Sequence, residues 1–147
     1  MKTISILGST GSVGCNTLNV IRALKEEFKV LALAAHSNIE LLYEQIQEFK
    51  PLFAAVYDEE QAERLQKKTQ IKIFKGLQGL IEAAVHPEVD KVMLAMSSNQ
   101  GIEPTYHAIN AGKEICLANK EVLVSAGSMI MELARKKIGR ASCRERV

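Results

Sequence analysis

The stretch ILGSTGSVGCNTLNVI, from Ile6 to Ile21, decides the fold class. It starts as an apolar run, passes through Gly8, Gly11 and Gly14, and ends with the apolar spacing of a helix. A glycine-rich turn between a strand and a helix leaves unpaired N–H groups at the helix N-terminus, where the helix dipole also favours an anion. The stretch therefore predicts a phosphate-binding turn between a first strand and a first helix.

The glycines are spaced G-x-x-G-x-x-G, with one more residue between the first two than in the common dinucleotide turn G-x-G-x-x-G. We expect Gly8 to permit a tight exit from the strand, Gly11 to let a pyrophosphate approach the backbone, and Gly14 to allow close helix–strand packing. Hydroxyl groups that could donate to the same anion belong to Ser9, Thr10 and Ser12. The spacing alone does not identify a cofactor, and a capped turn without any ligand is the alternative.

The rest of the chain alternates between short apolar segments and amphipathic segments. These patterns predict strands at 3–8, 28–35, 52–57, 71–74, 89–96 and 113–118. They predict helices at 12–27, 39–49, 58–68, 76–85, 104–111 and from 121 onward. Such alternation indicates βαβ units with right-handed crossovers. We therefore expect an α/β fold with a doubly wound, mostly parallel sheet, a Rossmann-like domain, over residues 1–137.

Composition and charge narrow the class of protein. Of the 147 residues 47% are hydrophobic, and no apolar stretch reaches the roughly 20 residues that span a bilayer. No secretory signal is apparent and the three cysteines form no C-x-x-C pair, so we expect a reduced, cytoplasmic protein without membrane association. The net charge of +2 comes from the last ten residues, because the remaining chain has equal numbers of acidic and basic residues. The charge therefore gives no indication of a nucleic-acid partner.

The last ten residues, IGRASCRERV at 138–147, differ from the rest of the chain. They have neither helical nor strand periodicity, and they interrupt a helix-like pattern at Lys137. Back-translated, they resemble a widely used sequencing-library adapter in frame over all ten codons. Our hypothesis is that the native sequence ends near Lys137 and that 138–147 are a non-native tail. A genuine basic tail is the alternative.

The end of the second predicted strand bears on the choice of cofactor. NAD sites usually place an Asp or Glu there, about 20 residues beyond the turn, to bind the ribose 2′-hydroxyl. Here the stretch is AAHSN, at 34–38, which has no carboxylate to repel a 2′-phosphate. His36, Ser37 and Asn38 could accept that phosphate, so we expect NADP rather than NAD. The alternatives are a capping box made by Ser37 and Glu40, which is compatible with phosphate binding, and an exposed loop histidine.

A second polar cluster, in LANKEVLVSAG at 117–127, follows the last predicted strand. Asn119, Lys120 and Glu121 should therefore lie at the carboxyl edge of the sheet, where doubly wound proteins bind ligands. By themselves these residues could equally be a helix N-cap, a solvated lysine and a first-turn acid.

Taken together, the segments ILGSTGSVGCNTL and AGKEICLANKEVLV resemble the N-terminal NADPH-binding domain of the 1-deoxy-D-xylulose 5-phosphate reductoisomerase family. AAHSN falls where that family binds the adenosine 2′-phosphate. The segments FKPLFAAVYDEE and GIEPTYHAINAGK also have the expected order and spacing. The resemblance covers about residues 1–137.

The resemblance implies an NADPH-dependent enzyme of the non-mevalonate isoprenoid pathway. Such an enzyme rearranges 1-deoxy-D-xylulose 5-phosphate, a phosphosugar, and reduces it to 2-C-methyl-D-erythritol 4-phosphate, usually as a homodimer. It also implies a role for each matched residue. The pyrophosphate would be held by Thr10, Gly11, Ser12 and Val13, and the ribose phosphate by His36, Ser37 and Asn38. The nicotinamide side would be contacted by Asn119 and Glu121, and the substrate by Lys120.

Two departures from the family pattern affect what this chain can do. Val122 stands where the family usually has Ser, which puts one peripheral polar contact in doubt. The family's acidic metal-binding motif lies beyond the matched segments, and we do not count Glu145 of the tail as a substitute. We therefore expect the divalent metal (Mg or Mn), most substrate contacts and turnover only in the full-length enzyme.

Other classes of protein remain as alternatives. An NADP-dependent reductase of the semialdehyde dehydrogenase type would need a nucleophilic cysteine at a ligand-facing helix start, and Cys15 and Cys116 fall inside a predicted helix and strand. A non-catalytic nucleotide-binding module would bind its ligand tightly by itself. A short-chain dehydrogenase is disfavoured, because no tyrosine is followed four residues later by lysine.

Overall fold

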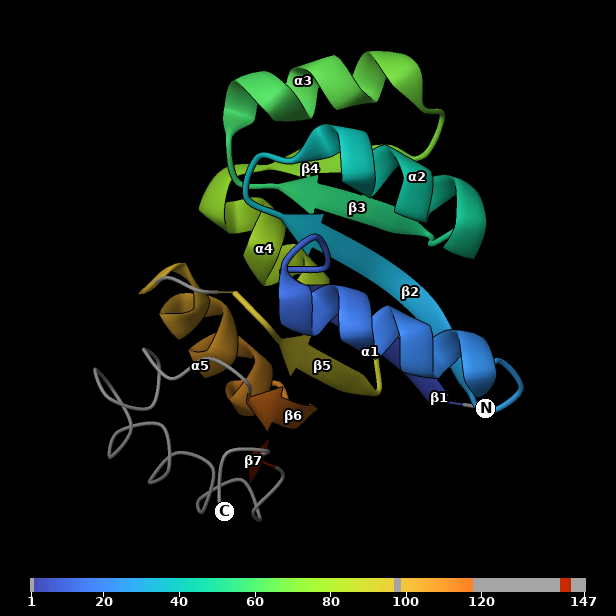
Figure 1. The fold of residues 1–147 in the computed structure, drawn as a ribbon. Helices are drawn as coiled ribbons and strands as arrows, with labels where there is room; N and C mark the ends of the chain where they lie inside the picture. Colours follow the sequence, from blue (N-terminus) through green and yellow to red (C-terminus); the bar gives the residue numbers. More distant parts are fainter. Residues whose placement is uncertain (1, 97–98, 118–140, 144–147) are drawn as a thin grey trace.

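The computed structural model of the chain describes residues 2–96, 99–117 and 141–143. In this described part, seven strands form one sheet in the order β4-β3-β2-β1-β5-β6-β7, and every neighbouring pair is parallel (Figure 1). The strands are β1 (Lys2–Leu7), β2 (Phe28–Ala35), β3 (Phe53–Val56), β4 (Lys72–Lys75), β5 (Lys91–Leu94), β6 (Glu114–Leu117) and β7 (Ala141–Cys143). The predicted doubly wound α/β fold is confirmed.

The helices alternate with the strands and cover both faces of the sheet (Figure 1). They are α1 (Ser12–Ala23), α2 (Ile39–Phe49), α3 (Glu59–Lys68), α4 (Gly76–Val85) and α5 (Ile102–Asn110), with the 3-10 helix η1 (Asn99–Gly101) before α5. Apolar side chains of α1, α2 and α3 pack in one buried cluster on one face of the sheet. Those of α4 and α5 pack in a second cluster on the other face. Because both faces are covered, the inner strands are apolar almost throughout.

Helix and strand boundaries follow the sequence patterns closely, and three of the predicted elements, at 28–35, 39–49 and 76–85, are exact. Helix α1 ends at Ala23, earlier than predicted, because a turn at Leu24 brings the chain to β2: the N–H groups of Glu27 and Phe28 both donate to the Leu24 carbonyl. Helix α5 begins two residues before Pro104. Proline has no N–H group, and the first turn of a helix accommodates it because the N–H groups of that turn have no intrahelical acceptor. The helix predicted from 121 onward lies outside the described residues.

The sequence did not predict β7, which lies within the ten-residue tail. Its three residues, Ala141–Cys143, pair with Ile115, Cys116 and Leu117 of β6. An open sheet edge offers unpaired backbone groups, and pairing with them requires no particular side-chain pattern. A strand at 141–143 can therefore form although the tail has no strand periodicity, and its absence from the predicted strands was wrong.

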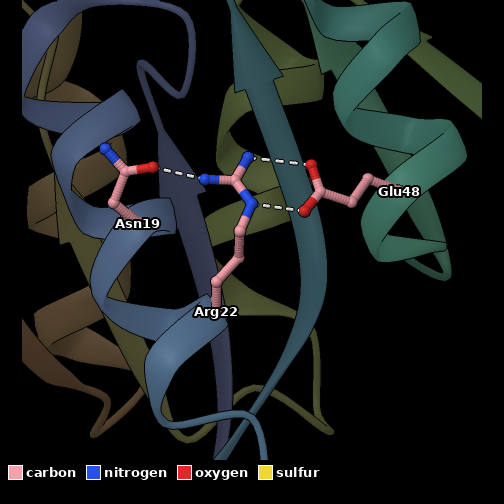
Figure 2. A network of polar contacts seen from close by, with 3 residues as sticks. All are labelled: Asn19, Arg22 and Glu48. Atoms are coloured by element: carbon pink, nitrogen blue, oxygen red, sulfur yellow. Dashed lines mark hydrogen bonds and ion pairs between the residues drawn. The ribbon is translucent and has the colours of Figure 1, made fainter.

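Polar contacts tie the elements together at the periphery. In the last turn of α1, Arg22 makes a two-pronged ion pair with Glu48 of α2 and a hydrogen bond with Asn19 (Figure 2). The hydrogen bond from Arg22 lowers the pKa of Glu48 and raises that of the guanidinium. Both side chains are nearly half exposed, so solvent screening keeps the contribution of this pair to stability small. Among the described residues, no helix is long and apolar enough to cross a membrane.

A second contact joins the starts of β1 and β5. The carboxylate of Asp90 accepts hydrogen bonds from the Thr3 N–H at 3.0 Å and the Thr3 hydroxyl at 3.1 Å. These bonds lower the pKa of Asp90 below its usual value. The Asp90 N–H returns a bond to the Thr3 carbonyl at 3.1 Å, so the two residues hold each other in place.

We expect Asp90→Asn to lower the free energy of unfolding at neutral pH, by less than about 1 kcal/mol because the site is exposed. A lowered folded-state pKa means that the charged form stabilises the fold above the unfolded-state pKa and that this is lost as the pH falls through the folded-state value. The difference from wild type should therefore vanish in acid. Urea unfolding across that pH range measures it, with Glu88→Gln as a control that removes a nearby charge. A difference that persists in acid would contradict the assignment.

Candidate functional site

The glycine turn lies at the carboxyl end of β1, the strand at which the sheet order reverses. From β1 the chain builds outward through β2, β3 and β4 on one side and through β5, β6 and β7 on the other. In open α/β sheets, ligands bind in the crevice outside the carboxyl ends of the strands at this reversal. The topology thus places the predicted phosphate turn where a nucleotide site is expected.

Two of the three glycines are required by close backbone approaches, as the sequence predicts. Gly8 has a φ of +95°, and a Cβ there would lie 2.7 Å from the carbonyl carbon and oxygen of Ala95. At Gly14 a Cβ would lie 2.1 Å from the Gly8 oxygen and 2.6 Å from the Ser9 Cα. Gly8 therefore lets the turn pass beside the end of β5, and Gly14 lets α1 pack directly on the turn.

Gly11 is different, because the protein itself leaves room for a side chain there. The nearest atom to a Cβ at Gly11 would be the Gly8 oxygen, at an ordinary 3.6 Å. Gly11 is the N-cap of α1 and lines the cavity beside the turn. Folding therefore does not require glycine at position 11. The absence of a side chain there leaves the cavity open for a ligand.

The N-terminus of α1 presents unpaired donors. The N–H of Gly11 is used within the turn, where it donates to the Gly8 carbonyl at 3.2 Å. Within the described part of the chain, the N–H groups of Thr10, Ser12 and Val13 find no backbone or side-chain acceptor. Helix α1 also has no side-chain cap and no acidic residue in its first turn. These donors and the helix dipole favour a bound anion.

A cavity of about 210 Å³ connects this turn with the ends of the neighbouring strands. It is lined by Gly8, Thr10, Gly11, His36, Ala95, Met96 and Gln100. The cavity therefore brings together two segments that the sequence assigned to one ligand: the glycine turn after β1 and His36 after β2. A larger hollow of about 600 Å³ lies around Arg22 and Glu48, at the other end of α1 from the turn.

The remaining residues predicted to bind the ribose phosphate lie next to the cavity in the chain. Ser37 and Asn38 are exposed in the loop between β2 and α2 and are not among the residues that line it. The side-chain oxygen of Asn38 accepts from the Leu41 N–H at 3.2 Å, so Asn38 is the N-cap of α2. The predicted capping box of Ser37 and Glu40 is therefore wrong, because the helix begins one residue later than that motif requires.

One further correction and one missed residue concern the turn itself. Ser9 is fully buried and does not line the cavity, so the prediction that its hydroxyl faces the anion is wrong. Its carbonyl instead accepts a hydrogen bond at 2.9 Å from Nε2 of Gln45, a 5% exposed residue of α2. Sequence reasoning missed Gln45. Its signal was a polar residue on the apolar face of α2, between Leu42 and Ile46, both of which are buried.

The second predicted cluster, at 119–121, follows β6 in the chain. Asn119, Lys120 and Glu121 lie outside the described residues, although β6 ends at Leu117 on the same edge of the sheet as the glycine turn. Cys15 lies in α1 and Cys116 in β6, as predicted, and both are free thiols. In the part of the chain that the structure describes, no group of three or more His, Cys, Asp or Glu side chains could hold a metal ion.

The sequence profile of 1-deoxy-D-xylulose 5-phosphate reductoisomerase matches residues 4–127. The chain belongs to this family. The reductoisomerase of Protochlamydia amoebophila (strain UWE25) is 51% identical over 138 residues, and that of Caldanaerobacter subterraneus subsp. tengcongensis is 47% identical over 139. Each alignment covers 93% of this chain and 36% of the relative, so the chain spans about a third of the length of these reductoisomerases.

Solved reductoisomerase structures have the same fold as this chain. One, in complex with NADPH, fosmidomycin and magnesium, matches with a TM-score of 0.91 at 34% identity, covering 97% of this chain and 36% of that one. The Zymomonas mobilis reductoisomerase in complex with NADPH matches with a TM-score of 0.89 at 30% identity, covering 97% and 38%. The biliverdin reductase from Synechocystis sp. PCC 6803, at 16% identity and a TM-score of 0.63 over 96% and 37% of the two chains, shares the fold alone.

Because Gly11 and Gly14 have different environments, we expect substitution by alanine to affect mainly stability at Gly14 and mainly cofactor binding at Gly11. Gly14→Ala should lower the free energy of unfolding by about 1–3 kcal/mol or more, because its methyl meets backbone that cannot turn aside. Gly11→Ala should cost about 1 kcal/mol or less as a poorer N-cap, yet weaken NADPH binding through its methyl in the cavity. Urea unfolding and cofactor titration separate the two effects. A stable Gly14→Ala variant would contradict the close approach of α1.

Proposed function

We propose that this chain is the NADPH-binding part of an enzyme that converts 1-deoxy-D-xylulose 5-phosphate to 2-C-methyl-D-erythritol 4-phosphate in non-mevalonate isoprenoid biosynthesis. Family membership and the likeness to NADPH-bound reductoisomerases support the proposal. The observation in this chain that carries it is the cavity at the sheet reversal, which Thr10 and His36 both line and which lies at the N-terminus of α1, where N–H groups are unpaired. The free thiols Cys15 and Cys116 agree with a reducing, cytoplasmic location.

The turn fits the pyrophosphate of NADPH, and its residues would contribute in two ways. Thr10, Ser12 and Val13 would donate their unpaired N–H groups to the phosphate oxygens. Gly11 would contribute by lacking a side chain, because its own N–H already donates to Gly8. The positive end of the α1 dipole would add a favourable field for the two negative charges.

The loop after β2 fits the 2′-phosphate of the adenosine ribose. His36 lies on the cavity, and Ser37 and Asn38 follow it at the N-terminus of α2. The hydrogen bond from Leu41 uses the oxygen of the exposed Asn38 side chain, so its amide NH₂ group is available as a donor. Beyond Ala35 the chain offers no carboxylate before Glu40, in contrast to the arrangement typical of NAD sites.

The chemical steps would involve residues that follow β6. From the resemblance of this segment to the reductoisomerase family we assign Asn119 and Glu121 to the nicotinamide side and Lys120 to the substrate. The position of β6, which ends at the ligand edge of the sheet just before these residues, supports the assignment. A lysine ammonium near the substrate oxygens would offset the charge that develops during hydride transfer. The divalent metal that polarises the substrate, and the homodimer contacts, would belong to the remaining two thirds of the full-length enzyme.

We further propose that the native domain comprises residues 1–137 and that 138–147 are a non-native tail. The sequence alignments with the curated relatives cover 92–93% of the chain, so the number of residues outside them, about ten, equals the length of the tail. The pairing of β7 with β6 is compatible with this proposal, because an edge strand joins through its backbone. The source DNA downstream of the Lys137 codon tests the proposal, which fails if that DNA encodes RASCRERV.

The cofactor assignment predicts that the chain binds NADPH more tightly than NADH. His36→Asp should weaken NADPH binding by about tenfold or more, since a carboxylate would face the 2′-phosphate, and should leave NADH binding nearly unchanged. Titration monitored by the fluorescence of the reduced nicotinamide measures both affinities. A folded wild-type chain that binds neither cofactor, or that prefers NADH, would overturn the assignment.

The assignment of the metal and most substrate contacts to the rest of the enzyme predicts no turnover by this chain alone. Mixing the chain with 1-deoxy-D-xylulose 5-phosphate, magnesium and NADPH should leave the absorbance of the reduced cofactor unchanged. A full-length relative, such as the Protochlamydia enzyme, provides the positive control. Measurable oxidation of NADPH by the chain alone would show that a complete active site is present.

A further inference from the structure

Two aromatic rings meet at the carboxyl ends of β2 and β3. The imidazole of His36 and the phenol ring of Tyr57 are stacked, with ring centroids 5.3 Å apart and an angle of 22° between their planes. Parallel pairing of Ala35 with Val56 places the next residue of each strand side by side. The backbone continues this pairing, since the Tyr57 N–H donates to Ala35 and the Asp58 N–H to the His36 carbonyl, both at 2.9 Å. The stack is therefore set by the strand register.

The two rings differ in how firmly they are held. Tyr57 is partly buried and packs against the apolar cluster under α4 and α5. His36 is exposed and reaches the cavity beside the glycine turn, whereas Tyr57 is not among the residues that line it. The tyrosine ring is thus a fixed surface behind a histidine that would otherwise sample several rotamers in solvent.

The carboxylate next to Tyr57 in the chain, that of Asp58, is occupied by another interaction and does not pair with His36 in the described structure. Asp58 follows Tyr57 directly, but its carboxylate accepts from the Glu60 and Gln61 N–H groups at 3.1 and 3.2 Å as the N-cap of α3. The negative charge is therefore engaged by its own helix, and the exposed imidazole remains the group directed at the cavity.

We propose that Tyr57 is a positioning residue for cofactor specificity: by stacking on His36 it holds the imidazole ready for the 2′-phosphate of NADPH. The inference rests on the proposed cofactor role of this site. A side chain that is ordered before binding loses less conformational entropy when the ligand arrives, so pre-ordering raises affinity. The gain is confined to NADPH, because NADH has no 2′-phosphate for His36 to meet.

The test compares Tyr57→Leu and Tyr57→Phe with Tyr106→Leu. Tyr106 serves as the control for a tyrosine–histidine pair away from the cavity, since it is 41% exposed and packs edge-on against its neighbour His107 on α5. Loss of an aromatic pair should weaken NADPH binding by about two- to tenfold in Tyr57→Leu while NADH binding stays unchanged. Tyr57→Phe keeps the ring and should bind like wild type, as should Tyr106→Leu. Equal losses for both cofactors, or none, would overturn the proposal.

A double-mutant cycle separates positioning from general packing. In a His36→Ala background Tyr57→Leu should have no further effect on NADPH binding, whereas additive losses would show that Tyr57 acts independently of His36. If Tyr57→Leu does not fold, NMR of the wild-type protein decides: NADPH should displace the ring signals of His36 and Tyr57 together, and movement of His36 alone would contradict the stack. A wild type that does not prefer NADPH would refute the proposed function instead.

Discussion

The whole arrangement depends on how closely α1 approaches the turn that ends β1. A single methyl group at Gly14 would come within 2.1 Å of the Gly8 oxygen, so the backbones touch with no side chain between them. This contact fixes the direction in which α1 leaves the turn, and hence the direction of the unpaired N–H groups at its N-terminus. Gly8, with its positive φ, holds the same turn beside the end of β5. The cavity is lined by Gly8 and by Ala95, the residue that follows β5.

The interactions that stabilise the rest of the fold lie away from the glycine turn and leave N–H groups at the N-terminus of α1 unpaired. Two apolar clusters cover the two faces of the sheet, and the peripheral ion pairs lie outside them. Lys91 and Glu114 pair at 2.6 Å between β5 and β6, and Arg22 joins α1 to α2 (Figure 2). The unpaired donors are left where the strands end, as expected for a site that a charged ligand completes.

The site has a supporting layer that does not touch the proposed ligand. Gln45 donates from α2 to the carbonyl of Ser9 and so braces the glycine turn from behind. Tyr57 provides the surface on which His36 stacks. Gln45 and Tyr57 both lie outside the first βα unit. The geometry of the glycine turn and of His36 therefore depends on how the neighbouring units pack against them.

The sequence by itself determined the fold class, most element boundaries and the position of the phosphate turn, because these follow from local periodicity and from where glycine is tolerated. The roles of Gly8 and Gly14 were also readable from their spacing. Only the tertiary structure decided that Ser9 is buried, that Asn38 and not Ser37 caps α2, and that Gln45 and Tyr57 support the site. The reason is physical: a pattern along the chain specifies which face of an element is apolar, whereas partners distant in sequence are chosen by strand register and by the angle at which helices pack.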